Sequence, residues 1–184
     1  MNYKKEEFPV DINKLIQKCE DTISILEDHF ANKDCLIVND LYIESTSNRC
    51  NDFLEKLQVT CNNKLHEKVK NENELQGLYV FGEFNKENGK IIPVYIGISR
   101  TIIRRLRQHV WGKNHNEATF AYLKARNNKK YNDDSKHEFI KLEQEEIKKY
   151  HFMVIPEKNY YDMYFMEVYI AGKLKIYWNS FKTH

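Results

Sequence analysis

The fold is decided at residues 77–97, which read GLYVFGEFNKENGKIIPVYIG. Aromatic and β-branched residues fill positions 77–84 and again 91–96, and residues of these types favour strands. The polar stretch 85–90 between them contains Asn and Gly, which is typical of a turn. Pro93 cannot donate to a strand ladder, so it indicates an edge strand or an irregularity. The whole stretch therefore predicts a β-hairpin.

Residues 1–75, which precede the hairpin, are predicted to form a helical region. Apolar residues recur at three- and four-residue steps over 11–30, with Asp11 as the N-cap, and again over 47–69. A short apolar run at 35–38 predicts either a strand or a helical turn. This region contains no chemical motif, so we expect it to serve in packing or dimerisation.

The residues after the hairpin predict further helices and one more strand. In chain order we expect a helix capped by Ser99 and ending near Trp111, a helix at 118–125, a polar loop at 127–138, a charged segment at 143–149 that is a helical turn or an insertion, a strand at 151–155, and a last helix at 160–170. Pro156 is expected to stop the strand.

The composition fits one folded, soluble unit, because 41% of the 184 residues are hydrophobic and 30% are charged. The net charge of +2 hides an asymmetry. Residues 100–130 hold nine basic residues and a single acidic one, Glu117, so this block carries +8 and the rest of the chain −6. The block favours a surface that faces a polyanion, and the alternative interpretation is a solvated helix face.

The cysteines and the N-terminus favour a cytoplasmic protein. Cys19, Cys35, Cys50 and Cys61 form no close pair with zinc-ligand spacing. Three of them, all except Cys35, fall on predicted apolar helix faces, and we interpret all four as reduced core residues. We expect neither a signal peptide nor a membrane-spanning segment.

Two tripeptides frame the predicted hairpin, Gly-Leu-Tyr at 77–79 and Tyr-Ile-Gly at 95–97. Four polar residues follow them along the chain: Arg105 eight residues after Gly97, His109 four residues further, Glu167 on the last predicted helix, and Asn179 twelve residues after it.

The chemistry of these side chains suits a phosphate ester. Arg105 and His109 share one helix face, which we expect to lie apart from the apolar stripe of that helix, and a guanidinium holds phosphate bidentately. The alternative is a surface Arg with a nearby His. Glu167 is the only charge in an apolar segment, so it needs either a divalent cation or a salt bridge to a core Lys or Arg. For Tyr79 and Tyr95 the alternative is simple packing.

In this register the chain resembles the GIY-YIG nucleases, which are named for such a pair of tripeptides. The resemblance covers residues 76–184 and implies a nuclease domain of α+β class, with a small three-stranded antiparallel sheet flanked by helices and preceded here by the N-terminal helical extension. Two positions depart from the family pattern. Leu78 replaces the middle Ile of the first tripeptide, and Ile98 stands where several members have Lys.

The resemblance also implies roles for individual residues. It assigns water activation to Tyr79, a place in the active site to Tyr95, binding of the scissile phosphate to Arg105, orientation of a tyrosine or proton transfer to His109, one divalent cation (Mg²⁺ or Mn²⁺) to Glu167, and supporting hydrogen bonds to Asn179. A subset of the family has a catalytic Lys in the hairpin, for which Lys86 and Lys90 are equal candidates.

We therefore expect a metal-dependent endonuclease that hydrolyses DNA phosphodiester bonds. The length favours a compact restriction-type enzyme, dimeric if it cuts both strands of a duplex, with the N-terminal helices aiding recognition or dimerisation. The residues expected to contact nucleic acid are Arg100, Arg104, Arg107, Lys113, Lys124 and Arg126. The alternatives are a nucleic-acid-binding module that has lost catalysis, a repair or mobile-element nuclease of the same family, and a structural or regulatory protein whose basic block only confers solubility.

Overall fold

The computed structural model describes residues 11–44, 46–60, 75–132 and 134–179, without the side chains of 58–60. Within these limits the fold is α+β, a three-stranded antiparallel sheet flanked by helices and preceded by an N-terminal helix, as the sequence predicts. Much of the helix expected at 47–69, together with Cys61, lies outside the described residues. None of the described helices is long and apolar enough to cross a membrane.

The sheet has the order β2-β1-β3, with β1 (Gly77–Asn85) between β2 (Lys90–Ser99) and β3 (His151–Pro156). Both neighbours run antiparallel to β1. Gly77 opens β1 at φ +151°, and a Cβ there would lie 2.1 Å from the Ile155 carbonyl oxygen. Only glycine fits this conformation and this contact, so the first residue of the Gly-Leu-Tyr tripeptide is required by strand pairing.

An irregularity interrupts the pairing of β1 with β2. Phe81 faces Tyr95 and Gly82 faces Pro93, so Val94 is an extra residue on β2. The sequence predicts an edge strand or an irregularity at Pro93, and both occur, because β2 is also the edge strand of the sheet. A bulge bends the strand locally and re-aims the side chains beside it.

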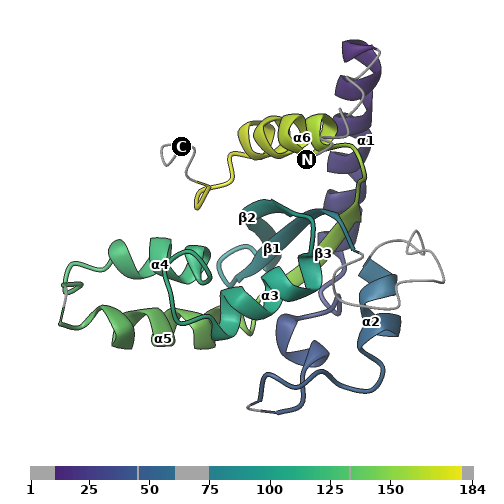
Figure 1. Ribbon diagram of the computed structural model, residues 1–184. Helices are drawn as coiled ribbons and strands as arrows, with labels where there is room; N and C mark the ends of the chain where they lie inside the picture. The colour runs from purple at the N-terminus through teal and green to yellow at the C-terminus, as the bar shows by residue number, and fades with distance from the viewer. Residues whose placement is uncertain (1–10, 45, 61–74, 133, 180–184) are drawn as a thin grey trace, which may run out of the picture.

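Two helical layers cover the sheet (Figure 1). The first packs on the face that presents Tyr79, Phe81 and Phe152, and the second on the face that presents Leu78 and Met153. The first layer contains α3 (Ile102–Trp111), α4 (Thr119–Arg126) and α5 (Lys136–Ile147), with η1 (Val38–Leu41) and α2 (Phe53–Thr60) beside them. The second layer contains α1 (Ile12–Ala31) and α6 (Tyr160–Lys173).

The N-terminal helix is part of the same core as the C-terminal one. Asp11 caps α1 as predicted, because its carboxylate accepts a hydrogen bond from the Asn13 backbone N–H at 2.9 Å. Leu26 and Phe30 of α1 are buried in one cluster with Met166 of α6 and with the aliphatic face of β1 and β2. Residues from the two ends of the chain thus share one hydrophobic core.

Several predicted boundaries are wrong. Strand β2 continues to Ser99, and α3 begins only at Ile102, because the Ser99 hydroxyl accepts from the Thr101 backbone N–H instead of capping a helix. Most of the charged segment 143–149 belongs to α5, which is a regular helix rather than a single turn. Helix α5 also includes residues 136–138, which were expected to be the end of a loop. Cys50 precedes α2 rather than lying on a helix.

The short apolar run 35–38 contributes to both structures that the sequence allowed. Ile37 makes an isolated antiparallel bridge to His151 of β3, and the next residue, Val38, begins the 3₁₀ helix η1. This run therefore joins the N-terminal segment to the outer edge of β3.

Candidate functional site

A cavity of about 420 Å³ opens beside β2, an edge strand of the sheet. Because β2 is an edge strand, side chains from both helical layers reach the same opening: α3 and α4 lie on one side and α6 on the other. Of the six residues predicted to be catalytic, five line this cavity: Tyr79, Tyr95, Arg105, Glu167 and Asn179. The sixth, His109, lies behind the tyrosines.

The floor of the cavity is built by the two tripeptides. Tyr79 faces Gly97 across the strand pair, and a Cβ on Gly97 would lie 2.5 Å from the Tyr79 hydroxyl oxygen. The glycine therefore lets the Tyr79 ring lie flat over β2. The Tyr95 ring lies 6.3 Å from that of Tyr79, between centroids, and stacks on Phe120 of α4 at 4.5 Å. Both tyrosines are buried.

His109 contacts Tyr79 directly. Its Nε2 lies 2.8 Å from the Tyr79 hydroxyl oxygen, and the imidazole is fully buried among the rings of Tyr79, Phe81 and Tyr95. The expectation that His109 lies apart from the apolar stripe of its helix is therefore wrong. Burial, with the charge of Arg105, holds the pKa of His109 well below its usual range, so the ring is neutral at neutral pH.

The surroundings of His109 also indicate which nitrogen carries the proton. Nδ1 is buried and has no hydrogen-bond partner among the described residues. A buried N–H without an acceptor is costlier than a buried lone pair without a donor, which favours the tautomer with hydrogen on Nε2. In that form His109 donates to the Tyr79 oxygen and leaves the Tyr79 hydroxyl proton free to point elsewhere.

Arg105 is held in place by the turn between α3 and α4. Its Nη1 donates to the carbonyl oxygens of Asn116 and Glu117 at 2.7 and 3.1 Å, and its Nη2 donates to the Thr119 hydroxyl at 2.8 Å. Glu117, the one acid of the basic block, caps the same turn by accepting from the Lys113 backbone N–H at 3.0 Å. The guanidinium is thus fixed at the rim of the cavity by neutral acceptors, and its charge is not cancelled by an ion pair with any described carboxylate.

Burial raises the pKa values of both tyrosines. For Tyr79 the nearby charge of Arg105 opposes this effect, and for Tyr95 the pKa lies well above its usual range. Both side chains are therefore neutral phenols in the free protein. Loss of the Tyr79 proton is favoured by the Arg105 guanidinium, by the hydrogen bond with Tyr95 and by the Nε2–H of His109.

Glu167 is half-buried on α6 and enters the cavity from the other side of β2. No described residue donates a hydrogen bond to it or forms an ion pair with it, so the predicted alternative of a core salt bridge is not found in this part of the chain. Burial raises the pKa of Glu167 to about 7. A carboxylate without a cation, facing a cavity, fits the oxygen ligand that Mg²⁺ or Mn²⁺ prefers.

Among the described residues, Glu167 does not belong to a larger cluster of metal-ligating side chains. No cluster of three or more His, Cys, Asp or Glu side chains occurs among the described residues. Mg²⁺ commonly takes one or two carboxylates and keeps waters or substrate phosphate oxygens as its other ligands. A single carboxylate therefore fits Mg²⁺ or Mn²⁺ better than zinc, which takes at least three protein ligands.

Asn179 fixes the edge of β2. Its side-chain oxygen accepts from the Ile96 backbone N–H at 2.9 Å, and its amide nitrogen donates to the Ile96 carbonyl at 2.8 Å. One residue earlier, the Trp178 N–H donates to the carbonyl of the bulge residue Val94 at 3.1 Å. The segment after α6 thus covers the otherwise unpaired edge of the strand that carries Tyr95.

The residues expected to contact nucleic acid fall into two groups. Five are exposed: Arg100, Arg104, Arg107, Lys113 and Arg126. Lys124 is different, because it hydrogen-bonds the Tyr150 hydroxyl, forms an ion pair with Glu143 at 3.3 Å and lies 5.7 Å from the Trp178 ring centroid. Its charge is therefore used inside the protein, where it connects α4, α5 and the segment that carries Asn179.

The two lysines of the hairpin lie far from the cavity. Lys86 and Lys90 flank the turn at the opposite end of β1 and β2, and neither lines the opening. Six residues separate Tyr79 from the end of β1 at Asn85, which at about 3.3 Å per residue amounts to roughly 20 Å. The structure brings neither lysine to the other candidate residues.

Other residues of the cavity carry no signal in the sequence. Thr119 and Asn116 hold Arg105, and their approach depends on the turn between α3 and α4 rather than on any spacing. Tyr122 of α4 and Tyr164 of α6 line opposite walls, and Tyr164 is 60% exposed. Aromatic residues on amphipathic helices usually indicate packing, so sequence patterns do not single them out.

Comparisons of the chain with protein-family models, with curated proteins and with solved structures find no match. The site is therefore interpreted from its own geometry.

Proposed function

We propose that this protein is a metal-dependent endonuclease of the GIY-YIG type that hydrolyses DNA phosphodiester bonds. The observation that carries the proposal is the convergence at one cavity of two tyrosines, a guanidinium and an unpaired carboxylate from four separate elements, β1, β2, α3 and α6. The spacing of motifs along the sequence singles out the same four side chains.

Arg105 is proposed to bind the scissile phosphate. Its guanidinium is anchored by neutral oxygens of Asn116, Glu117 and Thr119, so its charge remains available to an anion. A fixed guanidinium stabilises the extra negative charge of a pentacovalent phosphorus more than it stabilises the ground state, and that difference is what accelerates a reaction.

Tyr79 is proposed to take the proton from the attacking water. The phenol first loses its own proton to solvent, and the resulting phenolate accepts a hydrogen bond from His109 Nε2–H and lies near the charge of Arg105. The water oxygen then bonds to phosphorus while its proton passes to the Tyr79 oxygen, the bond to the leaving ester oxygen breaks, and that oxygen takes a proton from solvent. Because burial raises the pKa of Tyr79, we expect the reaction to be faster at alkaline pH.

Glu167 is proposed to hold one divalent cation, Mg²⁺ or Mn²⁺. When bound, such an ion stabilises negative charge on phosphate and leaving oxygens. The raised pKa of Glu167 means that a proton competes with the cation near neutral pH. Asn179 supports the site by fixing the β2 edge beside Tyr95.

The substrate is proposed to be double-stranded DNA, and a dimer would provide the two active sites that cutting both strands requires. The five exposed basic residues named above surround α3 and α4, where they can meet the phosphate backbone and make binding salt-dependent. The second candidate function, a binding module without catalysis, would keep these charges but would not need a carboxylate in the same cavity as Arg105.

Supercoiled plasmid incubated with the protein in Mg²⁺ or Mn²⁺ tests the proposal. We expect nicked or linear DNA from the wild type, none with EDTA, and a rate at least about a thousandfold lower for Glu167→Gln. Glu138→Gln, at an exposed position on α5, is the matched control and should cut normally. Plasmid that stays intact with the wild type would contradict the proposal and favour the binding module. Equal cutting by the wild type and Glu167→Gln would contradict the role proposed for Glu167 as the metal ligand.

A further inference from the structure

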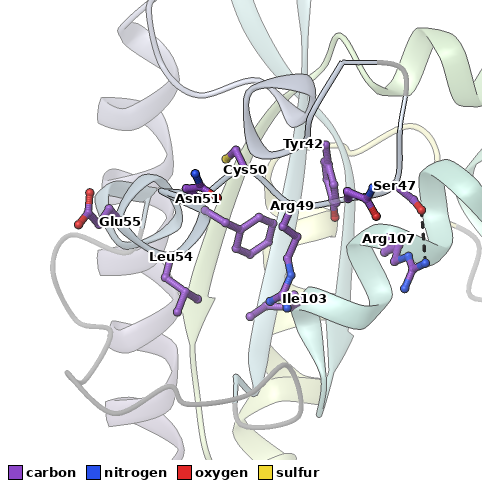
Figure 2. A pocket seen from close by; sticks show the side chains of 11 residues that line it. Tyr42, Ser47, Arg49, Cys50, Asn51, Leu54, Glu55, Ile103 and Arg107 are labelled. Atoms are coloured by element: carbon purple, nitrogen blue, oxygen red, sulfur yellow. Dashed lines mark hydrogen bonds between the residues drawn. The ribbon is translucent and has the colours of Figure 1, made fainter.

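A second and larger cavity, of about 700 Å³, lies between the N-terminal segment and α3 (Figure 2). The described residues that give it polar character are Ser47, Asn48, Arg49 and Asn51 from the segment before α2, and Arg107 from α3. We call this cavity the α3 cleft. It shares no lining residue with the cavity at the β2 edge.

The segment that forms one wall of the α3 cleft is held by backbone hydrogen bonds. Tyr42 and Arg49 form an isolated antiparallel bridge, the Ile43 N–H donates to the Asn48 carbonyl at 2.8 Å, and the Cys50 N–H donates to the Leu41 carbonyl at 3.1 Å. These bonds close a small hairpin-like loop. Its polar side chains are therefore presented from a fixed backbone, which reduces the entropy lost when they bind a ligand.

Two guanidinium groups face the α3 cleft. Arg49 lies over the Phe53 ring at 5.3 Å from its centroid, and Arg107 Nη2 donates to the Ser47 hydroxyl at 3.3 Å. Both arginines are exposed. The lining also includes one carboxylate, Glu55, and Figure 2 shows it at the far end of the cleft, directed away from both guanidinium groups. Arginines beside neutral Asn and Ser donors suit a phosphate group.

The position of Arg107 on α3 links this cleft to the catalytic cavity. At about 100° per residue, Arg107 lies roughly 160° around the helix from Arg105, and Arg104 lies between them on the exposed side. The two arginines therefore face opposite flanks of α3, separated by a helix about 10–12 Å wide. A small anion reaches only one flank of the helix. The major groove of a duplex is about 12 Å wide, close to the width of a helix, so a nucleic acid presents phosphates to both flanks at once.

We propose that the α3 cleft binds backbone phosphates of the same nucleic acid that enters the cavity at the β2 edge, with Arg49 and Arg107 as the charged contacts. The choice of ligand rests on the proposed function. This assigns a role in substrate binding to the segment before α2, which carries no recognisable motif.

The test measures equilibrium binding of the full chain to a fluorescein-labelled DNA duplex in EDTA, by anisotropy, at several salt concentrations. Each phosphate contact contributes about 0.9 to the slope of log K against log salt. We expect Arg49→Ala and Arg107→Ala each to lower this slope by about 1, and the double variant by about 2. Arg107→Lys keeps the charge and should keep the slope, which separates charge loss from misfolding.

Lys14→Ala is the matched control, because Lys14 is exposed on α1 at the opposite face of the sheet. Its slope should equal that of the wild type. A wild-type slope in the double variant would overturn the inference while leaving the nuclease proposal intact. A lowered slope in a protein that never cuts plasmid in Mg²⁺ would support the inference and overturn the nuclease proposal.

Discussion

The two faces of the β1–β2 hairpin differ in chemistry, although alternate residues of the same two strands form them. Leu78, Val80 and Ile96 point toward α1 and α6 and have only apolar atoms in their side chains. Tyr79 and Tyr95 point the other way, toward α3 and α4. The apolar face stabilises the fold by burial alone, whereas the aromatic face has polar atoms that burial destabilises unless they find partners.

The difference between the two faces coincides with the location of the candidate site. On the aromatic face, His109 is buried with one unpartnered nitrogen within the described residues, and both tyrosines have raised pKa values. Buried titratable groups with shifted pKa values are typical of catalytic sites. At the β2 edge the two faces meet, because Glu167 of α6 reaches the cavity from the apolar side.

The largest expected effect on the cleavage rate comes from substitution of Arg105, which lies beside the aromatic face of the hairpin. Arg105→Lys keeps the charge but loses the planar fork that bonds three neighbouring oxygens. We expect the single-turnover cleavage rate to fall about a thousandfold, or about 4 kcal/mol in activation free energy. Arg104→Lys, one residue earlier and exposed, should change the rate by less than about threefold. Similar rates for both variants would remove Arg105 from the site.

The next largest effect is expected on stability, from a substitution at the apolar face of the hairpin. Leu26 of α1 is fully buried against the sheet, so Leu26→Ala should lower the free energy of unfolding by about 2–5 kcal/mol. Urea denaturation followed by circular dichroism measures this change. Because α1 shares its core with β1 and α6, we expect a single unfolding transition, shifted to a lower urea concentration in Leu26→Ala. If α1 unfolded separately, the main transition would stay where it is.

A smaller effect follows from the carboxylate where the two faces meet. The pKa of Glu167 rises from an ordinary 4.5 to about 7 on folding, so the native state binds the proton more tightly than the unfolded state. Stability from this group is complete below pH 4.5 and is lost as pH rises toward 7. A glutamine at position 167 does not titrate, so the unfolding free energy of Glu167→Gln should exceed that of the wild type by an amount that grows from near zero at pH 4 to roughly 3 kcal/mol at pH 8.

Thermal melts at these two pH values, with and without Mg²⁺, check that expectation. At pH 8 the cation should raise the melting temperature of the wild type but not that of Glu167→Gln, because only the former has a carboxylate to bind it. A pH-independent difference between the two proteins would show that Glu167 has an ordinary pKa.

The sequence predicts the hairpin, α1 and the third strand, because their signals are local: alternation, a capping Asp11, and turn residues. The register of Arg105, His109 and Glu167 also singles out residues that the structure brings together. Long-range partners do not follow from such patterns. The use of Lys124 inside the protein depends on Glu143 and Tyr150, which approach only when α5 packs on α4.

Contacts made by turns are equally hidden. Thr119 and Asn116 reach Arg105 only because of the conformation between α3 and α4. The burial of His109 depends on which face of α3 meets the tyrosines, and the polar residues in the sequence of α3 suggest a more exposed position. Arg49 belongs to no motif, and only the loop closed by the Tyr42–Arg49 bridge places it beside α3.

Groups from opposite sides of the sheet edge are proposed to act as one catalytic site. Single-turnover cleavage of a labelled DNA duplex by Tyr79→Phe, Glu167→Gln and the double variant tests it most directly. Residues that act as a unit are strongly non-additive, so the double variant should be no slower than the slower single variant. A double variant slower by the product of the two single effects would contradict the claim and indicate two independent contributions.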